Sequence, residues 1–168
     1  QGAMLQMLNH GVSTGALFLM VGMIYDRAHT RMIADFGRVA VKMPVFTAFF
    51  LIVTLSSIGL PLTNGFVGEF WILNGAFTAG FGWGRLYASL ATFGVVLGAA
   101  YMLWMFKRVF WGPENADHES GTHHLHDDLN LREIAVLLPL VGLIFWMGLR
   151  PGTFVAASEA PVASLLSA

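Results

Sequence analysis

The chain contains no cysteine. This absence excludes a disulfide framework, a thiolate nucleophile and a cysteine-ligated iron–sulfur cluster. No phosphate-binding glycine motif, nucleophile elbow or HExxH zinc motif occurs either, so we expect neither a cofactor nor a catalytic redox centre in this chain. The net charge of −1 lacks the basic excess of nucleic-acid-binding domains, and no nucleic-acid partner is expected.

Charge is scarce as well. Charged residues make up 11% of the 168 residues and hydrophobic residues 56%, whereas a soluble domain carries about 25% charged residues. Long uncharged stretches cover residues 43–68, 70–84, 86–106 and 134–149. A helix needs roughly 20 apolar residues to cross a bilayer. The composition therefore predicts a multi-pass integral membrane protein in contact with lipid.

Five apolar segments stand out, and we expect an all-α membrane fold because open strands leave backbone groups unpaired in lipid. The segments are residues 3–25, 44–60, 65–80, 86–109 and 133–149. We assign 1–152 to the transmembrane region and expect the tail, 153–168, to form a short helix on the membrane surface. Since the chain opens with Gln1 inside the first segment, we expect it to be an internal piece of a longer protein.

Helix-breaking residues separate the second segment from the third. The run from Gly59 to Gly65 includes Pro61, which lacks an N–H group, and an Asn-Gly pair that favours a turn. Residues 44–80 therefore form either two short helices or one helix interrupted between Pro61 and Gly65.

The cations predict an orientation if every segment is counted as a crossing. On this count one side carries Arg27, Arg31, Arg38, Lys42, Arg85 and Arg150, and the other carries Lys107, Arg108 and Arg132. Because cytoplasmic loops are enriched in Lys and Arg, the connection 26–43 is predicted to lie in the cytoplasm.

Glu69 lies between two uncharged stretches and is the first candidate for function. An ionised carboxylate near mid-membrane costs about 3 kcal/mol even on a lenient scale, so such groups usually face a cavity or a partner. Withdrawal from water favours the protonated form, which suits a group that takes up and releases protons. The alternative is a carboxylate that caps free N–H groups at a helix end beside the break.

Histidines provide the other candidates. His10 lies inside the first segment and is either a proton relay, because imidazole titrates near neutral pH, or a hydrogen-bonded residue between helices. His29 follows that segment and has the character of a loop or helix-end residue. Four further histidines share a polar loop with several acids but lack a rigid metal-binding spacing, so we expect a solvated loop and no metal site: His118, His123, His124 and His126.

Four stretches resemble a known family. They are residues 6–13 (QMLNHGVS), 25–31 (YDRAHTR), 59–70 (GLPLTNGFVGEF) and 107–113 (KRVFWGP). They are similar to the M subunit of bacterial NADH-quinone oxidoreductase, respiratory complex I, whose mitochondrial counterpart is chain 4. The stretch 59–70 is the most specific, and the resemblance covers nearly the whole chain.

The resemblance implies an antiporter-like subunit of about 14 helices in two inverted repeats, each with an interrupted helix, of which this chain covers roughly helices 10 to 14. It implies a proton-translocating subunit of NADH:quinone oxidoreductase in the bacterial inner membrane, with other complex I membrane subunits as partners. Glu69 would match the family's glutamate on the second interrupted helix, and His10 and His29 its histidines on the proton path. A cation/proton antiporter subunit, or a hydrogenase or photosynthetic-complex relative, is the alternative.

Overall fold

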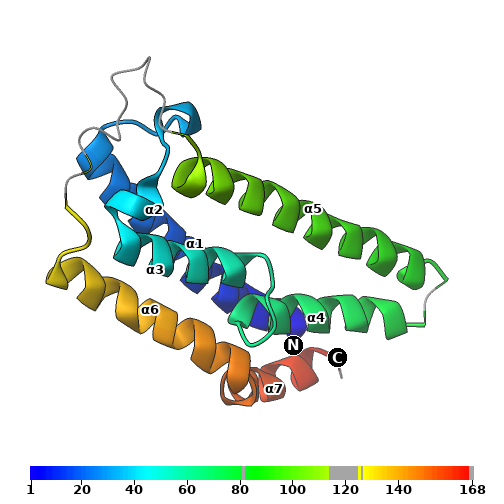
Figure 1. Cartoon of the computed structure of the whole chain (residues 1–168). Coiled ribbons are helices and arrows are strands. Elements are labelled where there is room, and N and C mark those ends of the chain that lie inside the picture. Colours follow the sequence, from blue (N-terminus) through cyan, green and yellow to red (C-terminus); the bar gives the residue numbers. More distant parts are fainter. Residues whose placement is uncertain (81, 114–124, 126, 167–168) are drawn as a thin grey trace.

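The computed structural model describes residues 1–80, 82–113, 125 and 127–166, and the ordered elements in these ranges are helices (Figure 1). In chain order they are α1 (Gly2–Ala28), η1 (Ile33–Asp35), α2 (Val39–Lys42), α3 (Pro44–Ser57), α4 (Asn64–Thr78), α5 (Gly84–Trp111), α6 (Leu131–Leu149) and α7 (Gly152–Leu166). All five predicted apolar segments are helical, as α1, α3, α4, α5 and α6, which confirms the all-α membrane fold. The tail forms α7, and its place on the membrane surface stays a prediction.

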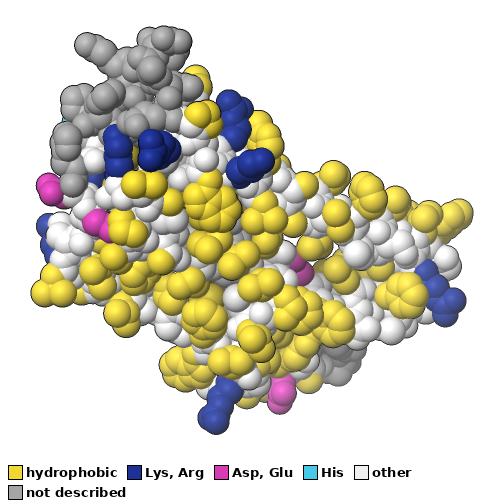
Figure 2. All heavy atoms as spheres, viewed as in Figure 1, with side chains coloured by type: hydrophobic (Ala, Val, Ile, Leu, Met, Phe, Trp, Pro, Cys, Tyr) yellow, Lys and Arg dark blue, Asp and Glu magenta, His cyan; other side chains and the backbone are white. Residues whose placement is uncertain are grey.

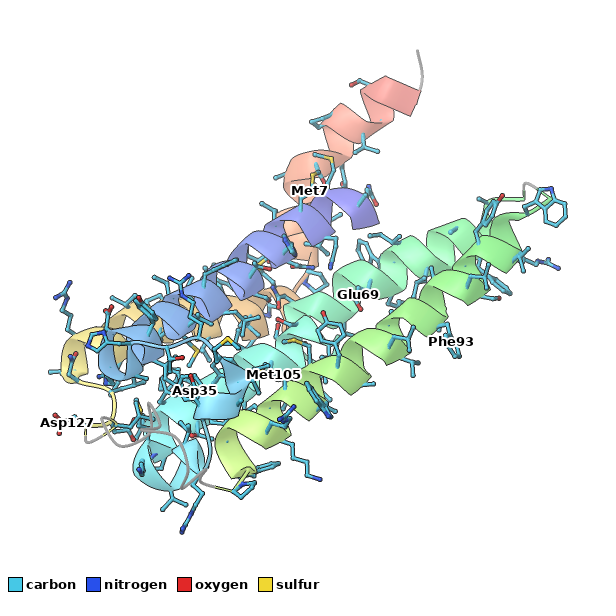
Figure 3. All side chains as sticks on the ribbon, turned by 90° about the horizontal axis from the view of Figure 1, so that it is seen from above. Met7, Asp35, Glu69, Phe93, Met105 and Asp127 are labelled. Atoms are coloured by element: carbon cyan, nitrogen blue, oxygen red, sulfur yellow. The ribbon has the colours of Figure 1, made fainter. Side chains whose placement is uncertain are left out.

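The helices α3 and α4 form one interrupted crossing. They follow one another in the same direction in both ribbon views (Figures 1 and 3). Between them the backbone takes positive φ angles, 74° at Gly59 and 80° at Leu62. The predicted interruption is confirmed, but Asn64 and Gly65 are not part of a turn, because they are the first two residues of α4.

The interruption does not reverse the chain, and this corrects the predicted sides of the cations. Of the described helices, α1, α5 and α6 are each long and apolar enough to cross a membrane, and α3 followed by α4 would make a fourth crossing. The backbone N–H of Arg38 donates to the carbonyl of Gly112 over 3.1 Å, which joins the connection 26–43 to the end of α5. One end therefore carries seven of the chain's nine cations, Arg27, Arg31, Arg38, Lys42, Lys107, Arg108 and Arg132, and the other end carries Arg85 and Arg150.

Hydrogen bonds tie three helices together at this cationic end. The Arg27 guanidinium, at the end of α1, donates to both carboxylate oxygens of Glu133 in the first turn of α6, over 2.9 and 2.8 Å. The Asp128 carboxylate accepts from the first free N–H groups of α3, at Val45 and Phe46, over 2.7 and 3.0 Å. We call these contacts the end clasp. They satisfy helix-end groups that the helices themselves leave unpaired.

Aromatic packing joins α3 to α5 beside the end clasp. The Phe50 and Phe110 rings have centroids 4.9 Å apart, and Phe106 stacks on Phe110 at 4.4 Å. Most of α5 beyond this cluster is exposed and apolar; Phe93, for example, is 65% exposed and faces away from the bundle (Figure 3). Figure 2 shows hydrophobic side chains over most of the visible face, as expected of a surface that meets lipid or neighbouring helices.

Glycines permit the close packing of the interrupted crossing. A Cβ atom at Gly65 would overlap the carbonyl oxygen of Ser56, and one at Gly68 would overlap the side chains of Gln6 and Asn9. The start of α4 therefore lies directly against the end of α3 and against α1. At Gly65 the obstacle is backbone, so no other residue leaves enough room there, whereas at Gly68 a larger residue would displace the ends of two side chains.

The corrected arrangement predicts that the two ends of the helix bundle lie on opposite sides of the membrane. Val41 and Trp83 are 68% and 66% exposed and lie at the cationic end and at the α4–α5 connection. Because the cationic end is expected in the cytoplasm, Val41→Cys should react with a membrane-impermeant maleimide from that side and Trp83→Cys from the opposite side. The chain has no cysteine of its own, so each variant carries one thiol in this polypeptide. Labelling of both variants from one side would contradict the arrangement.

The close packing at Gly65 predicts that one added methyl group destabilises the protein. Gly65→Ala should destabilise the subunit by roughly 1–3 kcal/mol, the usual cost of overpacking, because the start of α4 must move away from α3. Gly75→Ala is the matched control on the same helix, since a Cβ there meets nothing within 4 Å. The thermal unfolding temperature of the purified protein compares the two. Equal unfolding temperatures would show that the close approach is not required.

Candidate functional site

Glu69 lies in the second turn of α4, near the middle of the molecule. Figure 3 shows it where α4 passes α5, whereas Asp35 and Asp127 lie toward one end. Its side chain is partly buried and rests on the break, because a Cβ atom at Gly59 would be only 2.8 Å from Glu69 Oε2. Since α4 begins at Asn64, Glu69 lies beyond the first four N–H groups that a cap serves. This position favours the functional interpretation over the cap.

Two cavities meet at Glu69. The first, of about 370 Å³, lies between α4 and α5 and is bounded mainly by apolar and small residues such as Ile72 and Gly94. The second, of about 230 Å³, lies on the α1 side. Four residues line both cavities, namely Ser57, Glu69, Gly98 and Tyr101. The carboxyl group is therefore part of the wall that separates the cavities.

The cavity on the α1 side brings His10 and Glu69 together. Both residues line it, along with Gln6 and Thr14. The Thr14 hydroxyl lies 3.1 Å from His10 Nδ1, a hydrogen bond whose donor depends on the tautomer of the ring. The structure thus places the two predicted proton-carrying residues around one partly open cavity, in which the exposed imidazole is held on α1 and Glu69 is partly buried.

His29 lies elsewhere. It caps the C-terminal end of α1 with a left-handed backbone (φ 54°), and its N–H donates to the carbonyl of Tyr25 over 2.7 Å. Its side chain is exposed. At 1.5 Å per helical residue it is about 28 Å from His10 along the helix. The structure therefore does not bring His29 into either cavity, and its part in proton transfer stays a prediction.

Four buried polar residues join α1 to the break between α3 and α4, and none of them was predicted to be functional from the sequence. We call Asn9, Ser13, Ser56 and Asn64 the polar clamp. Asn9 Nδ2 donates to the Asn64 carbonyl over 2.7 Å, and Asn64 Nδ2 donates to the Asn9 carbonyl over 3.3 Å. The Ser13 and Ser56 hydroxyls both donate to Asn64 Oδ1. The signal in the sequence is the spacing of Asn9 and Ser13, because residues four apart share one helix face.

The histidines of the polar loop, His118, His123, His124 and His126, lie outside the described residues. In the part of the chain that the structure describes, no group of three or more histidine, cysteine or acidic side chains is placed to hold a metal ion. The expectation that this loop binds no metal stays a prediction.

Comparison with known proteins identifies related chains. The family described as NADH:quinone oxidoreductase/Mrp antiporter, TM, matches residues 1–98. The chain is 40% identical to NADH-ubiquinone oxidoreductase chain 4 of Marchantia polymorpha, over 99% of this chain and 32% of that protein. It is 43% identical to NADH-quinone oxidoreductase subunit M of Rickettsia typhi, over 98% of this chain and 32% of that protein.

A solved structure shows the same fold. A chain of respiratory complex I from Thermus thermophilus with bound NADH superimposes with a TM-score of 0.79 at 34% identity, over 91% of this chain and 30% of that chain. This chain thus spans about a third of the length of the curated relatives it matches. The resemblance seen in the sequence is confirmed: the chain belongs to the NADH:quinone oxidoreductase/Mrp antiporter transmembrane family.

Proposed function

We propose that the chain is part of a proton-translocating membrane subunit of an NADH:quinone oxidoreductase, in which Glu69 carries protons. One observation carries the proposal above all others. Glu69 lies in the wall between two cavities, beside the break of an interrupted helix, and shares one cavity with His10. The names of the relatives support the assembly, and the bacterial relatives support a bacterial inner membrane as its location.

A carboxyl group at this place responds to nearby charge. Its ionised form costs several kcal/mol in an apolar surrounding, so a small change in local charge decides whether the proton stays. The Ser57 and Tyr101 side chains line both cavities with Glu69, and a hydrogen bond from either hydroxyl would favour the carboxylate. Such opposing effects leave both protonation states of Glu69 accessible. A change of charge in a neighbouring part of the complex then releases or reloads the proton.

His10 serves the transfer on the α1 side. A neutral imidazole accepts a proton on one nitrogen and donates one from the other. The Thr14 hydroxyl lies 3.1 Å from Nδ1 and 3.5 Å from Nε2 of His10, and the residue lines the cavity that Glu69 also lines. Protons would pass between His10 and Glu69 through this cavity, and Glu69 would exchange them with the cavity between α4 and α5.

We propose that electron transfer uses no residue of this chain. The chain lacks cysteine, so we propose that NADH oxidation and quinone reduction occur in other subunits and reach this chain as a charge or conformational signal. The exposed apolar side of α5 is the surface offered to lipid and to neighbouring membrane helices. His29, at the cationic end of α1, would serve at the entrance of the path.

The substitution Glu69→Gln tests the role of the carboxyl group. Glutamine keeps the size of the side chain but cannot bind or release a proton, so proton pumping in sealed vesicles should be abolished or sharply reduced while the complex still assembles. Glu159→Gln is the matched control, because Glu159 is exposed on α7, away from both cavities. Normal pumping by an assembled Glu69→Gln complex would overturn the proposal.

His10→Ala separates a relay from a structural histidine. A relay predicts that the rate of proton pumping per assembled complex falls, because the transfer path on the α1 side is cut. Leu8→Ala is the control on the same helix, since Leu8 is 51% exposed and lines neither cavity. If His10→Ala lowers only the amount of assembled complex, the histidine is structural.

A further inference from the structure

Asn9 has a buried amide oxygen without a partner. The residue is 1% exposed, and Oδ1 accepts no hydrogen bond within the described part of the chain. The other half of the amide is occupied, because Nδ2 donates to the Asn64 carbonyl over 2.7 Å and to Gln6 Oε1 over 3.3 Å. A buried acceptor without a donor is unfavourable, so a donor is expected at this atom.

The orientation of the amide follows from its partners. Turning the group over would place Oδ1 against the Asn64 carbonyl oxygen, which only accepts hydrogen bonds. Nδ2 therefore stays on the polar clamp, and Oδ1 is the free atom. The polar clamp fixes the direction in which Asn9 offers its acceptor.

The residue that carries the free oxygen lines the cavity that Glu69 and His10 also line, although Oδ1 itself has almost no exposed surface. Asn9 is one of the lining residues of this space of about 230 Å³. One water needs about 10–15 Å³ of such volume and two to four polar partners. Gln6, His10 and Glu69 supply further polar groups around the same space. Volume and chemistry both suit ordered water.

We propose that Asn9 is a positioning residue, which binds a water molecule through Oδ1 and so aligns proton transfer between His10 and Glu69. This inference rests on the proposed function. The water donates one hydrogen bond to Asn9 Oδ1. Its other O–H and its lone pairs stay available for the transfer. When the water accepts a proton from His10 and passes its own to the Glu69 carboxylate, the water is unchanged. Asn9 itself neither gains nor loses a proton.

Two substitutions at Asn9 test the acceptor. Leucine has a similar volume but no acceptor, so Asn9→Leu should lose most of its proton pumping per assembled complex. A protonated aspartic acid offers an O–H to the Asn64 carbonyl and keeps an acceptor oxygen. Asn9→Asp should therefore recover pumping as the pH falls, whereas Asn9→Leu should not at any pH. Protonation also restores the hydrogen bond to the Asn64 carbonyl, so the amount of assembled complex is measured at each pH. A merely structural role would change that amount with pH and leave the pumping per assembled complex unchanged.

Asn64→Ser is the control for the polar clamp. It removes the amide that bonds Ser13, Ser56 and the Asn9 carbonyl but leaves the backbone carbonyl that holds Asn9 Nδ2. This variant should lower assembly without lowering the protons moved per NADH oxidised. If Asn9→Leu behaves in the same way, the inference is wrong while the role of Glu69, tested by Glu69→Gln, is unaffected.

A high-resolution map of the assembled complex gives a test that does not depend on activity. A water should lie within about 2.7–3.2 Å of Asn9 Oδ1, the range of ordinary hydrogen bonds. A protein donor from another part of the complex at this atom would overturn the inference. The map tests whether a water binds Asn9 even if the Asn9→Leu complex fails to assemble.

Discussion

The close contact of the start of α4 with α1 and with the end of α3 is the constraint on which the rest of the structure depends. Gly65 lets α4 meet the backbone of α3, and Gly68 leaves room for side chains of α1. The polar clamp pairs groups at the break. Unpaired backbone groups are costly away from water, so a broken helix in a membrane needs such partners. Because this contact is fixed, Glu69, which directly follows Gly68, stands at a defined place between two cavities.

Much of the fold was predictable from the sequence, because the lack of charge marks apolar helices regardless of their neighbours. The five segments and the interruption follow from uncharged stretches and from Pro61. The side of the membrane on which each cation lies was not predictable, because an interrupted helix and a reversal of the chain show the same local sequence pattern. Asn64 and Gly65 show the reason: a turn-favouring pair begins a helix here because Gly65 is needed for contact with Ser56.

The candidate site was predictable in part. Glu69 is conspicuous because an acid among apolar residues is expensive wherever it lies, and His10 stands out for its chemistry. Their common cavity depends on how α1 packs against α4, which no local pattern in the sequence reports. Asn9 and Tyr101 were missed as site residues for the same reason. Amide and phenol side chains occur in many structural roles, and only the residues around them show whether the role is functional.

The end clasp has a mechanical consequence. It anchors α1, α3 and α6 at the cationic end, and the aromatic cluster beside it anchors α5. Farther along, α5 is largely exposed and is held mainly by α4. The cationic end therefore holds several helices together, whereas the far part of α5 has α4 as its main support. Because the start of α4 is fixed against α1 and α3, a force on the far part of α5 would be passed through α4 to the region of the break, where Glu69 lies.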